Sequence, residues 1–301
     1  MNAKVKGFIA GILAAVFYGT NPLGALPLYA HGITSGNVLF YRYGLATFMF
    51  AIWVAFSGET FKIKRGHAIK LSVLGSFVGI SSVLLFLSFY YMNAGVASTI
   101  LFSYPIMTAV LMVVFYHEHI KWATALSILL AVSGIGLLYR GDGGTTLSAM
   151  GILLVLGSSL LYALYIVYVN QFKIEMSPIK YTLWITLFAW ISIVGYMIFV
   201  GDPIVMLDET EEWLYALQLA LFPTLLSLYC INISIRSIGS TTSSILGALE
   251  PVTAVVISTF VFGEAFTLRL AIGIVMILSS VLLIILKKLS YPEISIHIFG
   301  A

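Results

Sequence analysis

Residues 104–118 have the sequence YPIMTAVLMVVFYHE, and residues 250–264 have the sequence EPVTAVVISTFVFGE. A proline and a glutamate recur at the same places in the two stretches, 146 residues apart in both cases. The pairs are Pro105 with Pro251 and Glu118 with Glu264. Both stretches are otherwise almost entirely apolar, which makes them two copies of one helical pattern rather than a chance match.

A second set of matches lies nearer the start of each half. Gly7 and Tyr18 recur as Gly151 and Tyr162, 144 residues further on. Because the matches keep the same order in both halves, we predict two related repeats that divide near residues 141–148.

The composition places these repeats in a membrane. Of 301 residues, 60% are hydrophobic and 9% are charged, and the mean hydropathy is +1.06. Soluble proteins carry about a quarter charged residues, so this chain cannot cover a surface that faces water. The composition argues against a soluble enzyme, a disordered protein and a secreted disulfide domain, and the single cysteine, Cys230, cannot form an internal disulfide.

Long apolar runs predict an all-α integral membrane protein, because a transmembrane helix needs roughly 20 mostly apolar residues. The first run resembles a signal peptide but contains Asn21, Pro22 and Pro27 and leads directly into another run, so it is taken as a helix. Ten spans are expected, at about 7–28, 37–57, 69–91, 95–115, 121–139, 149–170, 179–200, 213–235, 241–262 and 268–287.

The basic residues predict the orientation of these spans. With ten spans both termini lie on one side, and if that side is the cytoplasm it holds 12 of the 15 Lys and Arg residues, all except Arg42, Arg140 and Arg269. Both termini are therefore expected in the cytoplasm. An acidic loop then lies outside, either as a solvated connection or to attract cations; its acids are Asp202, Asp208, Glu209, Glu211 and Glu212.

Because each predicted repeat has five helices, an odd number, the two repeats must have opposite orientations in the membrane. The first repeat, 1–144, and the second, 145–290, must cross the membrane in opposite senses, with 291–301 left as a short cytoplasmic tail. The predicted fold is therefore ten transmembrane helices as two inverted five-helix repeats. This architecture recurs in secondary transporters, which expose one midplane site to either side in turn.

The motifs resemble those of the EamA-type members of the drug/metabolite transporter superfamily over about residues 1–290. The resemblance is clearest in the second half, where Leu249-Glu250-Pro251-Val252 is followed by Gly263-Glu264 and Gly273. The first half contains a weaker copy, Tyr104-Pro105 followed by Glu118. Phe40-Tyr41-Arg42-Tyr43 and Tyr18-Gly19-Thr20-Asn21-Pro22 are similar to the family's segments in the first two helices.

The resemblance implies a ten-helix exporter of amino acids, other small metabolites or drug-like compounds in a bacterial inner membrane, working by alternating access. A passive uniporter or a channel-like facilitator is the alternative to a proton antiporter. The expected partners are a small-molecule substrate, the lipid bilayer and protons as a candidate coupling ion. The chain is expected to act as a monomer or a loose dimer.

Glu250 is the candidate for substrate binding or proton coupling. It lies near the middle of the predicted span 241–262, where an acid costs about 2.5–3.5 kcal/mol unless it is protonated, paired or in a wet cavity. Tyr104 is its counterpart in the first repeat and is expected across the same cavity. A glutamate that only holds two helices together is the alternative.

Three prolines inside predicted spans are expected to kink them. Pro22, Pro105 and Pro251 each free the carbonyl four residues earlier, so each marks a hinge, a binding site or a purely structural kink. Ser243 is expected on the same face of one continuous helix as Glu250, together with Gly247 and Ala254.

Other polar and aromatic side chains are candidates for the substrate pathway. Arg42 either snorkels to the interface or faces inward beside Asn21 to attract a carboxylate. Aromatic residues either belong to the interfacial belt or form the cavity wall, and these are Tyr18, Tyr162, Tyr165 and Trp184.

Searches for other chemistry predict no catalytic role, cofactor or metal. His117-Glu118-His119 does not have zinc-site spacing, and the sequence contains no phosphate loop and no nucleic-acid patch outside the predicted cytoplasmic loops. We therefore expect a protein that is not an enzyme and binds no nucleic acid.

Overall fold

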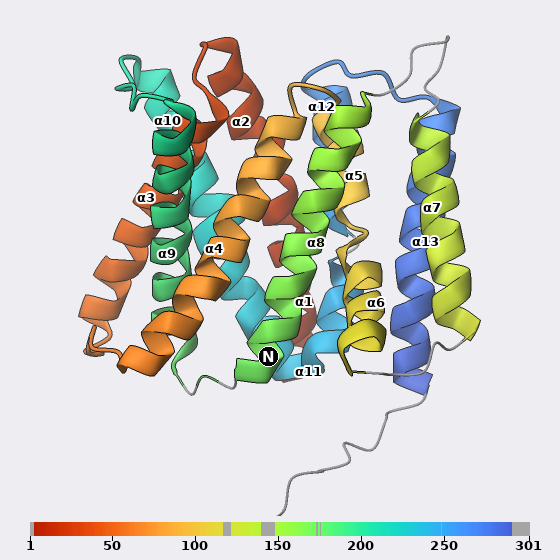
Figure 1. Cartoon of the computed structure of the whole chain (residues 1–301), viewed down its shortest axis with the longest axis horizontal. Helices are drawn as coiled ribbons and strands as arrows, with labels where there is room; N and C mark the ends of the chain where they lie inside the picture. The colour runs from red at the N-terminus through yellow and green to blue at the C-terminus, as the bar shows by residue number, and fades with distance from the viewer. Residues whose placement is uncertain are drawn as a thin grey trace, which may run out of the picture.

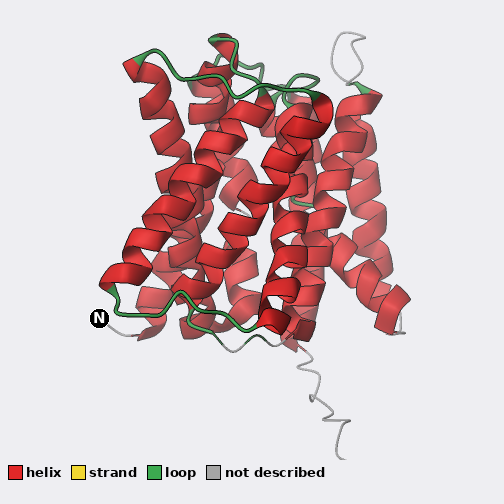
Figure 2. Cartoon of the chain, turned by 60° about the vertical axis from the view of Figure 1, so that its left-hand side comes forward, coloured by secondary structure: helices red, strands yellow, loops and turns green. Residues whose placement is uncertain are grey.

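The computed structural model describes residues 3–116, 122–139, 148–172, 174, 176–247 and 249–290. Within these ranges every regular element is a helix, and the helices stand side by side in one bundle (Figures 1 and 2). The sequence His117-Glu118-His119, the repeat boundary at 144 and the tail 291–301 lie outside the described residues.

The helices of the first half follow the predicted spans, with two breaks. They are α1 (Ala3–Gly19), α2 (Asn21–Ala30), α3 (Ser35–Phe56), α4 (Arg65–Ser88), α5 (Ala94–Leu101), α6 (Tyr104–Tyr116) and α7 (Trp122–Tyr139). The predicted first span corresponds to α1 and α2, and the predicted fourth span corresponds to α5 and α6.

The described part of the second half contains six α-helices and one π-helical turn. Its elements are α8 (Ala149–Phe172), α9 (Pro178–Val200), α10 (Thr210–Ala220), the π-helix η1 (Leu221–Leu226), α11 (Ser227–Leu246), α12 (Leu249–Phe260) and α13 (Leu268–Ser290).

Six stretches of the described chain are long and apolar enough to cross a membrane. They are Lys4–Ala30, Ser35–Phe56, Arg65–Ser88, Ala149–Val169, Pro178–Val200 and Thr210–Ile231. Shorter apolar helices occur at Ala94–Thr108, Leu249–Phe260 and Leu268–Ser280. The protein is thus a multi-pass helical membrane protein.

The helix α11 turns back on itself. Gly11 of α1 is packed so closely that a β-carbon there would clash with both Ser234 and Leu246. Twelve residues of a straight α-helix span about 18 Å, so both residues can reach Gly11 only if the chain reverses between them. The first part of α11 therefore continues α10 and η1, and its end leads toward α12.

The two halves interlock rather than forming separate bodies. α4 of the first half packs against α8 and α9, α1 packs against α11, and α7 packs against α13 at one edge of the bundle (Figure 1). The sequence contains two Gly-x-x-x-Gly patterns, which predict close helix packing: Gly7 with Gly11, and Gly75 with Gly79. In the structure the first pair contacts α11 and the second pair contacts α9.

The prolines lie at helix breaks instead of bending continuous helices. Pro22, Pro105 and Pro251 each stand in the first turn of a new helix, where a missing N–H costs nothing. The predicted spans 7–28 and 95–115 thus each contain two helices, and 241–262 contains the end of α11 and the whole of α12. Lys4–Ala30 still forms one candidate membrane span.

Each carbonyl freed by a proline has another donor. The side-chain amide of Asn21 donates to the Tyr18 carbonyl at 2.7 Å, and the Ser159 hydroxyl donates to the Leu101 carbonyl at 3.0 Å. The Gly247 carbonyl accepts the Glu250 backbone N–H at 3.0 Å. These bonds remove the cost of an unpaired carbonyl at membrane depth and so make the breaks stable.

The short helix α5 of the first half packs against α12 of the second half. A β-carbon on Gly95 of α5 would meet Val255 of α12 at 3.0 Å, and the backbone amides of Ala94 and Gly95 donate to the Glu264 carboxylate. Partial burial raises the pKa of Glu264 above its usual value, and these hydrogen bonds oppose that rise. Glu264 thus caps the start of α5, which its own N-cap residue, Asn93, leaves without a side-chain bond.

Candidate functional site: a polar chamber between the two halves

Four polar side chains from four helices meet near the middle of the bundle. Tyr18 lies at the end of α1, Tyr104 begins α6, Tyr162 lies halfway along α8, and Glu250 is in the first turn of α12. The rings of Tyr104 and Tyr162 are 4.8 Å apart in an edge-to-face arrangement. Two of the helices come from each half, so the meeting point belongs to both repeats.

These four side chains lie within electrostatic range of one another, and they and the space beside them are here called the central chamber. All four are only partly buried although they lie deep in the bundle. Accessible surface at that depth means that a water molecule can reach them, so they border a space rather than packed protein. Tyrosine hydroxyls and a carboxylate are the polar handles that orient a small ligand.

Glu250 is held at the chamber by a close contact between its backbone and Gly19, the last residue of α1. A β-carbon on Gly19 would meet the Glu250 backbone carbonyl at 2.8 Å, so only glycine allows α1 and α12 to come this close. The carboxylate lies within electrostatic range of Tyr18, Tyr104 and Arg42. Among the described residues none donates a hydrogen bond to it.

Arg42 is buried next to the chamber and bonded to neutral groups. Its Nη1 donates to the Asn21 Oδ1 at 2.8 Å, and its Nε donates to the Thr224 Oγ1 at 2.9 Å. The residue is 2% exposed, so its guanidinium faces inward beside Asn21 and does not snorkel to the interface. The attraction of a substrate carboxylate stays a prediction. Its guanidinium also lies 5.9 Å from the centre of the Tyr18 ring and 5.3 Å from that of Tyr43.

Thr224 is a site residue that the sequence reasoning missed. The π-helix η1 around Pro223 lets the Thr224 hydroxyl donate to the Leu219 carbonyl at 2.9 Å while it accepts from Arg42. A proline followed by threonine in the middle of an apolar run was the available signal, because π-helical turns are frequent at functional sites.

Arg42 and Glu250 do not form a direct ion pair in the described chain, as their difference in depth predicts. They still interact electrostatically across the chamber. Two opposite charges that face one space without touching leave room for a group to lie between them. Burying such charges is costly unless each finds a counter-charge.

Two predicted pathway residues lie farther from this centre. Tyr165 stacks on Tyr162 with ring centres 5.6 Å apart, but it also packs in an apolar cluster between α4, α8 and α9. Trp184 belongs to that cluster, and the centre of its ring lies 6.0 Å from that of Phe188. The described contacts of Trp184 do not include a residue of the chamber.

Ser243 is not on one helix with Glu250. α11 ends at Leu246 and α12 begins at Leu249, so the predicted continuous face through Ser243, Gly247 and Glu250 is wrong. The Ser243 side chain lies outside the described part of the structure.

The predicted outer loop is bonded to the bundle rather than merely solvated. The Thr34 hydroxyl donates to the Asp202 carboxylate at 2.7 Å, and the Asn37 side-chain amide donates to it at 3.3 Å. Asn37 also accepts the Val205 N–H at 2.8 Å. These contacts fasten the loop after α9 to the start of α3.

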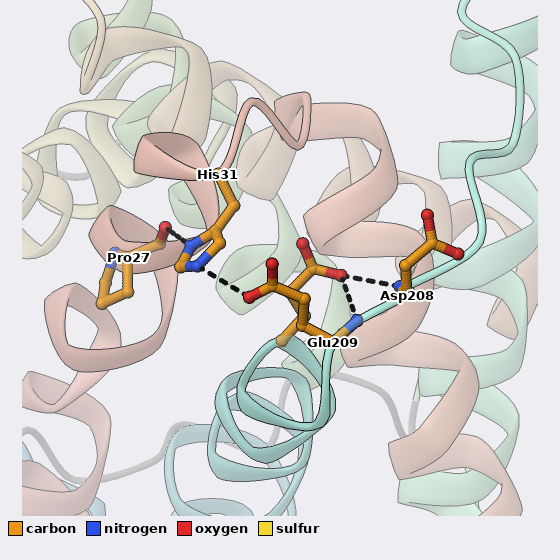
Figure 3. A network of polar contacts seen from close by, with 5 residues as sticks. Pro27, His31, Asp208 and Glu209 are labelled. Atoms are coloured by element: carbon orange, nitrogen blue, oxygen red, sulfur yellow. Dashed lines mark hydrogen bonds and ion pairs between the residues drawn. The ribbon is translucent and has the colours of Figure 1, made fainter.

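Three further acids of this loop, Asp208, Glu209 and Glu212, form a network with His31 at the end of α2 (Figure 3). Glu212 accepts the Asp208 and Glu209 backbone amides at 2.9 and 3.3 Å and completes a capping box at the start of α10. The His31 ring lies 3.5 Å from the Glu209 carboxylate and 2.8 Å from the Pro27 carbonyl. The hydrogen bond to Pro27, together with nearby Glu209, raises the pKa of His31 above 6.5.

The fold and site together define a multi-pass membrane protein in which polar side chains from both halves meet between the helices. The profile of the EamA-like transporter family matches residues 5–140 and again residues 149–286. The chain therefore belongs to the EamA-like transporter family and is a transporter.

Curated relatives agree with this assignment without naming a cargo. The chain is 26% identical over 212 residues to the uncharacterized transporter YdfC of Bacillus subtilis, covering 69% of this chain and 68% of that protein. Two further uncharacterized transporters of the same organism also match. YetK is 25% identical over 189 residues, which cover 61% of this chain and 57% of YetK. YyaM is 24% identical over 250 residues, which cover 80% of this chain and 81% of YyaM.

A solved crystal structure has the same fold. It aligns with a TM-score of 0.66 and 14% identity, over 96% of this chain and 100% of that one. At this identity the likeness concerns the fold alone.

Proposed function

We propose that this protein is a secondary transporter that carries a small zwitterionic molecule through the central chamber by alternating access. Amino acids and similar small metabolites have the required chemistry, an ammonium and a carboxylate on one compact body. We further propose that it exports this cargo across the inner membrane, with both termini in the cytoplasm.

The observation that carries the substrate class is the separation of Arg42 from Glu250. Among the described residues the partners of the guanidinium are neutral: it donates to oxygens of Asn21 and Thr224 and is hydrogen-bonded to the Tyr18 side chain. The same residues offer the Glu250 carboxylate no hydrogen bond. A zwitterion that bridges them supplies each charge with the opposite one. The tyrosine hydroxyls of the chamber then bind the remaining polar atoms.

Alternating access is supported by the breaks in the helices that line the chamber. The breaks before Tyr104 and Glu250 occur at matching places in the two halves, and half-helices that meet at the membrane midplane recur in transporters. We propose that the half-helices rock about these breaks, so that α5 and α12 separate on one side while their counterparts close on the other.

Glu250 is also the proposed site of proton coupling. A carboxylate that binds a substrate ammonium in one state can take up a proton when the substrate leaves, which couples the two movements in opposite directions. A passive uniporter lacks this second step and is the competing mechanism.

Counterflow in proteoliposomes tests transport directly. Vesicles loaded with unlabelled amino acid are expected to accumulate the labelled compound transiently, which a channel cannot do. A screen by thermal unfolding against amino acids, nucleosides and cationic drugs identifies the cargo first, because a ligand that binds the folded state raises the unfolding temperature.

Two variants connect such a hit to the chamber. Tyr104→Ala and Glu250→Ala are expected to remove the thermal shift, whereas Glu211→Ala, in the outer loop, is expected to keep it. An unchanged shift in both chamber variants would place the binding site elsewhere. Counterflow absent for every stabilising compound would contradict a carrier mechanism.

A further inference from the structure

A second cavity lies at the end of the bundle where the chain begins. It has a volume of about 440 Å³ and is formed by the loop between α3 and α4 together with the loop that leads into α9. Both loops lie at the lower end in Figures 1 and 2. The residues that line it are Glu59, Lys62, Ile63, Lys64, His67, Met176, Ser177 and Lys180.

The charges around this cavity are mostly positive. It is lined by Lys62, Lys64 and Lys180 and by a single acid, Glu59. That acid already accepts a hydrogen bond from the Ser177 hydroxyl at 2.5 Å. Lys180 donates to the Lys62 carbonyl at 2.8 Å, which orients its ammonium group while two of its three protons remain for another acceptor.

The start of α4 adds backbone donors to the same cavity. Its N-cap residue, Lys64, makes no side-chain cap, so the first amides of the helix lack an acceptor from it. A β-carbon on Gly66 would meet nothing within 4 Å, so the space above this first turn is open. An anion bound there would also face the positive end of the helix dipole.

The position of the cavity indicates where the anion comes from. Four candidate membrane spans end around it: Ser35–Phe56, Arg65–Ser88, Ala149–Val169 and Pro178–Val200. It therefore lies at the level of lipid headgroups. Apolar side chains within three residues of its lining residues along the chain are exposed, Phe56 to 88%, Phe61 to 45% and Ile69 to 61%, and such surfaces suit acyl chains.

We propose that this cavity binds the phosphate group of an anionic phospholipid, with its acyl chains lying against Phe56 and Ile69. The lysines and the open first turn of α4 hold the phosphate. Because Lys62 belongs to the first half of the chain and Lys180 to the second, the bound lipid joins the two halves at this end of the bundle.

Lipid binding to the full chain in detergent tests the proposal. Native mass spectrometry and thermal unfolding compare phosphatidylglycerol with phosphatidylcholine for the wild type and for Lys62→Ala/Lys180→Ala. Each lysine near a membrane surface contributes about 1 kcal/mol to anionic lipid binding, so the double variant is expected to bind phosphatidylglycerol about thirtyfold more weakly. Lys4→Ala/Lys6→Ala removes the same charge from the same end and is expected to bind normally.

Three results would overturn the proposal. The first is equal phosphatidylglycerol binding by the wild type and the cavity variant, and the second is an equal loss in the control. The third is full stabilisation by inorganic phosphate alone, which would identify a soluble anion instead. If the double variant does not fold, Lys64→Glu reverses one exposed charge and is expected to weaken binding of the anionic lipid in the same assay.

Discussion

Carboxylates occur in two contrasting places in this protein, the outer loop and the central chamber. In the loop, Asp202 and Glu212 each accept two hydrogen bonds, and Glu209 faces His31. In the chamber, Glu250 accepts none from the described residues. The loop acids therefore hold the structure together, whereas the proposed role of Glu250 is to bind the substrate or a proton.

Glu250→Gln gives the largest expected effect. The amide keeps the shape of the side chain but removes the charge, so uphill transport is expected to fall by at least about thirtyfold, as for other buried charged contacts. The unfolding temperature is expected to stay the same or rise, since a buried charge is removed. Proteoliposome uptake and thermal unfolding measure the two quantities. A variant that transports at the wild-type rate with the same pH dependence would end the coupling role of Glu250.

Arg42→Gln is expected to lower both the stability of the protein and its affinity for the substrate. The change removes one of the two chamber charges and leaves Asn21 and Thr224 without their donor, which costs roughly 1–3 kcal/mol in a buried site. Substrate binding, measured by the ligand-induced thermal shift, is expected to fall about tenfold or more. Full stability in this variant would mean that the bonds to Asn21 and Thr224 contribute little.

Asp202→Ala is expected to lower stability and leave transport within about twofold of the wild type. Thr34 and Asn37 lose their shared acceptor, at a cost of about 1–2 kcal/mol. Asp208→Ala is the matched control, because Asp208 contributes its backbone N–H to the network in Figure 3. A strong transport defect in Asp202→Ala with normal stability would assign the loop a direct role in transport.

His31 gives the smallest expected effect, and it depends on pH. The pKa of His31 is raised in the folded protein, first by its hydrogen bond to the Pro27 carbonyl. The contribution of protonated His31 is therefore fully present below the unfolded pKa of about 6.5 and is lost as the pH rises through the higher folded pKa. The wild type is expected to exceed His31→Gln in unfolding temperature at about pH 5.5 and to lose that advantage at about pH 8.5.

Much of the fold follows from patterns in the sequence. The spacing of apolar runs predicted where the long helices lie, and Gly7, Gly11, Gly75 and Gly79 predicted two close helix contacts. Tyr104 was expected across one cavity from Glu250, whereas Tyr18 and Tyr162 were expected either at its wall or in the interfacial belt. The structure brings the four side chains together, and their role in the substrate pathway stays a prediction. The predictions of the long helices and their close contacts succeed because helix length and small-residue spacing are local properties.

The exact helix ends and the hydrogen bonds of the loop after α9 could not be predicted from local sequence patterns. Whether a proline kinks a helix or ends it depends on donors such as Ser159, 58 residues from the Leu101 carbonyl that it satisfies. The partner of Thr34 is Asp202, 168 residues away. No local pattern reports such pairs, and the same is true of Thr224, whose role depends on Arg42 being buried beside it.

The bonds that close the helix breaks also have a consequence for biosynthesis. When the first half leaves the ribosome, the Leu101 carbonyl and the Arg42 guanidinium are already at membrane depth, but Ser159 and Thr224 have not yet been made. α5 has eight residues, too few to cross a bilayer alone. Until the second half is inserted, the Leu101 carbonyl therefore lacks the Ser159 hydroxyl, and Arg42 has Asn21 but not Thr224 as a partner.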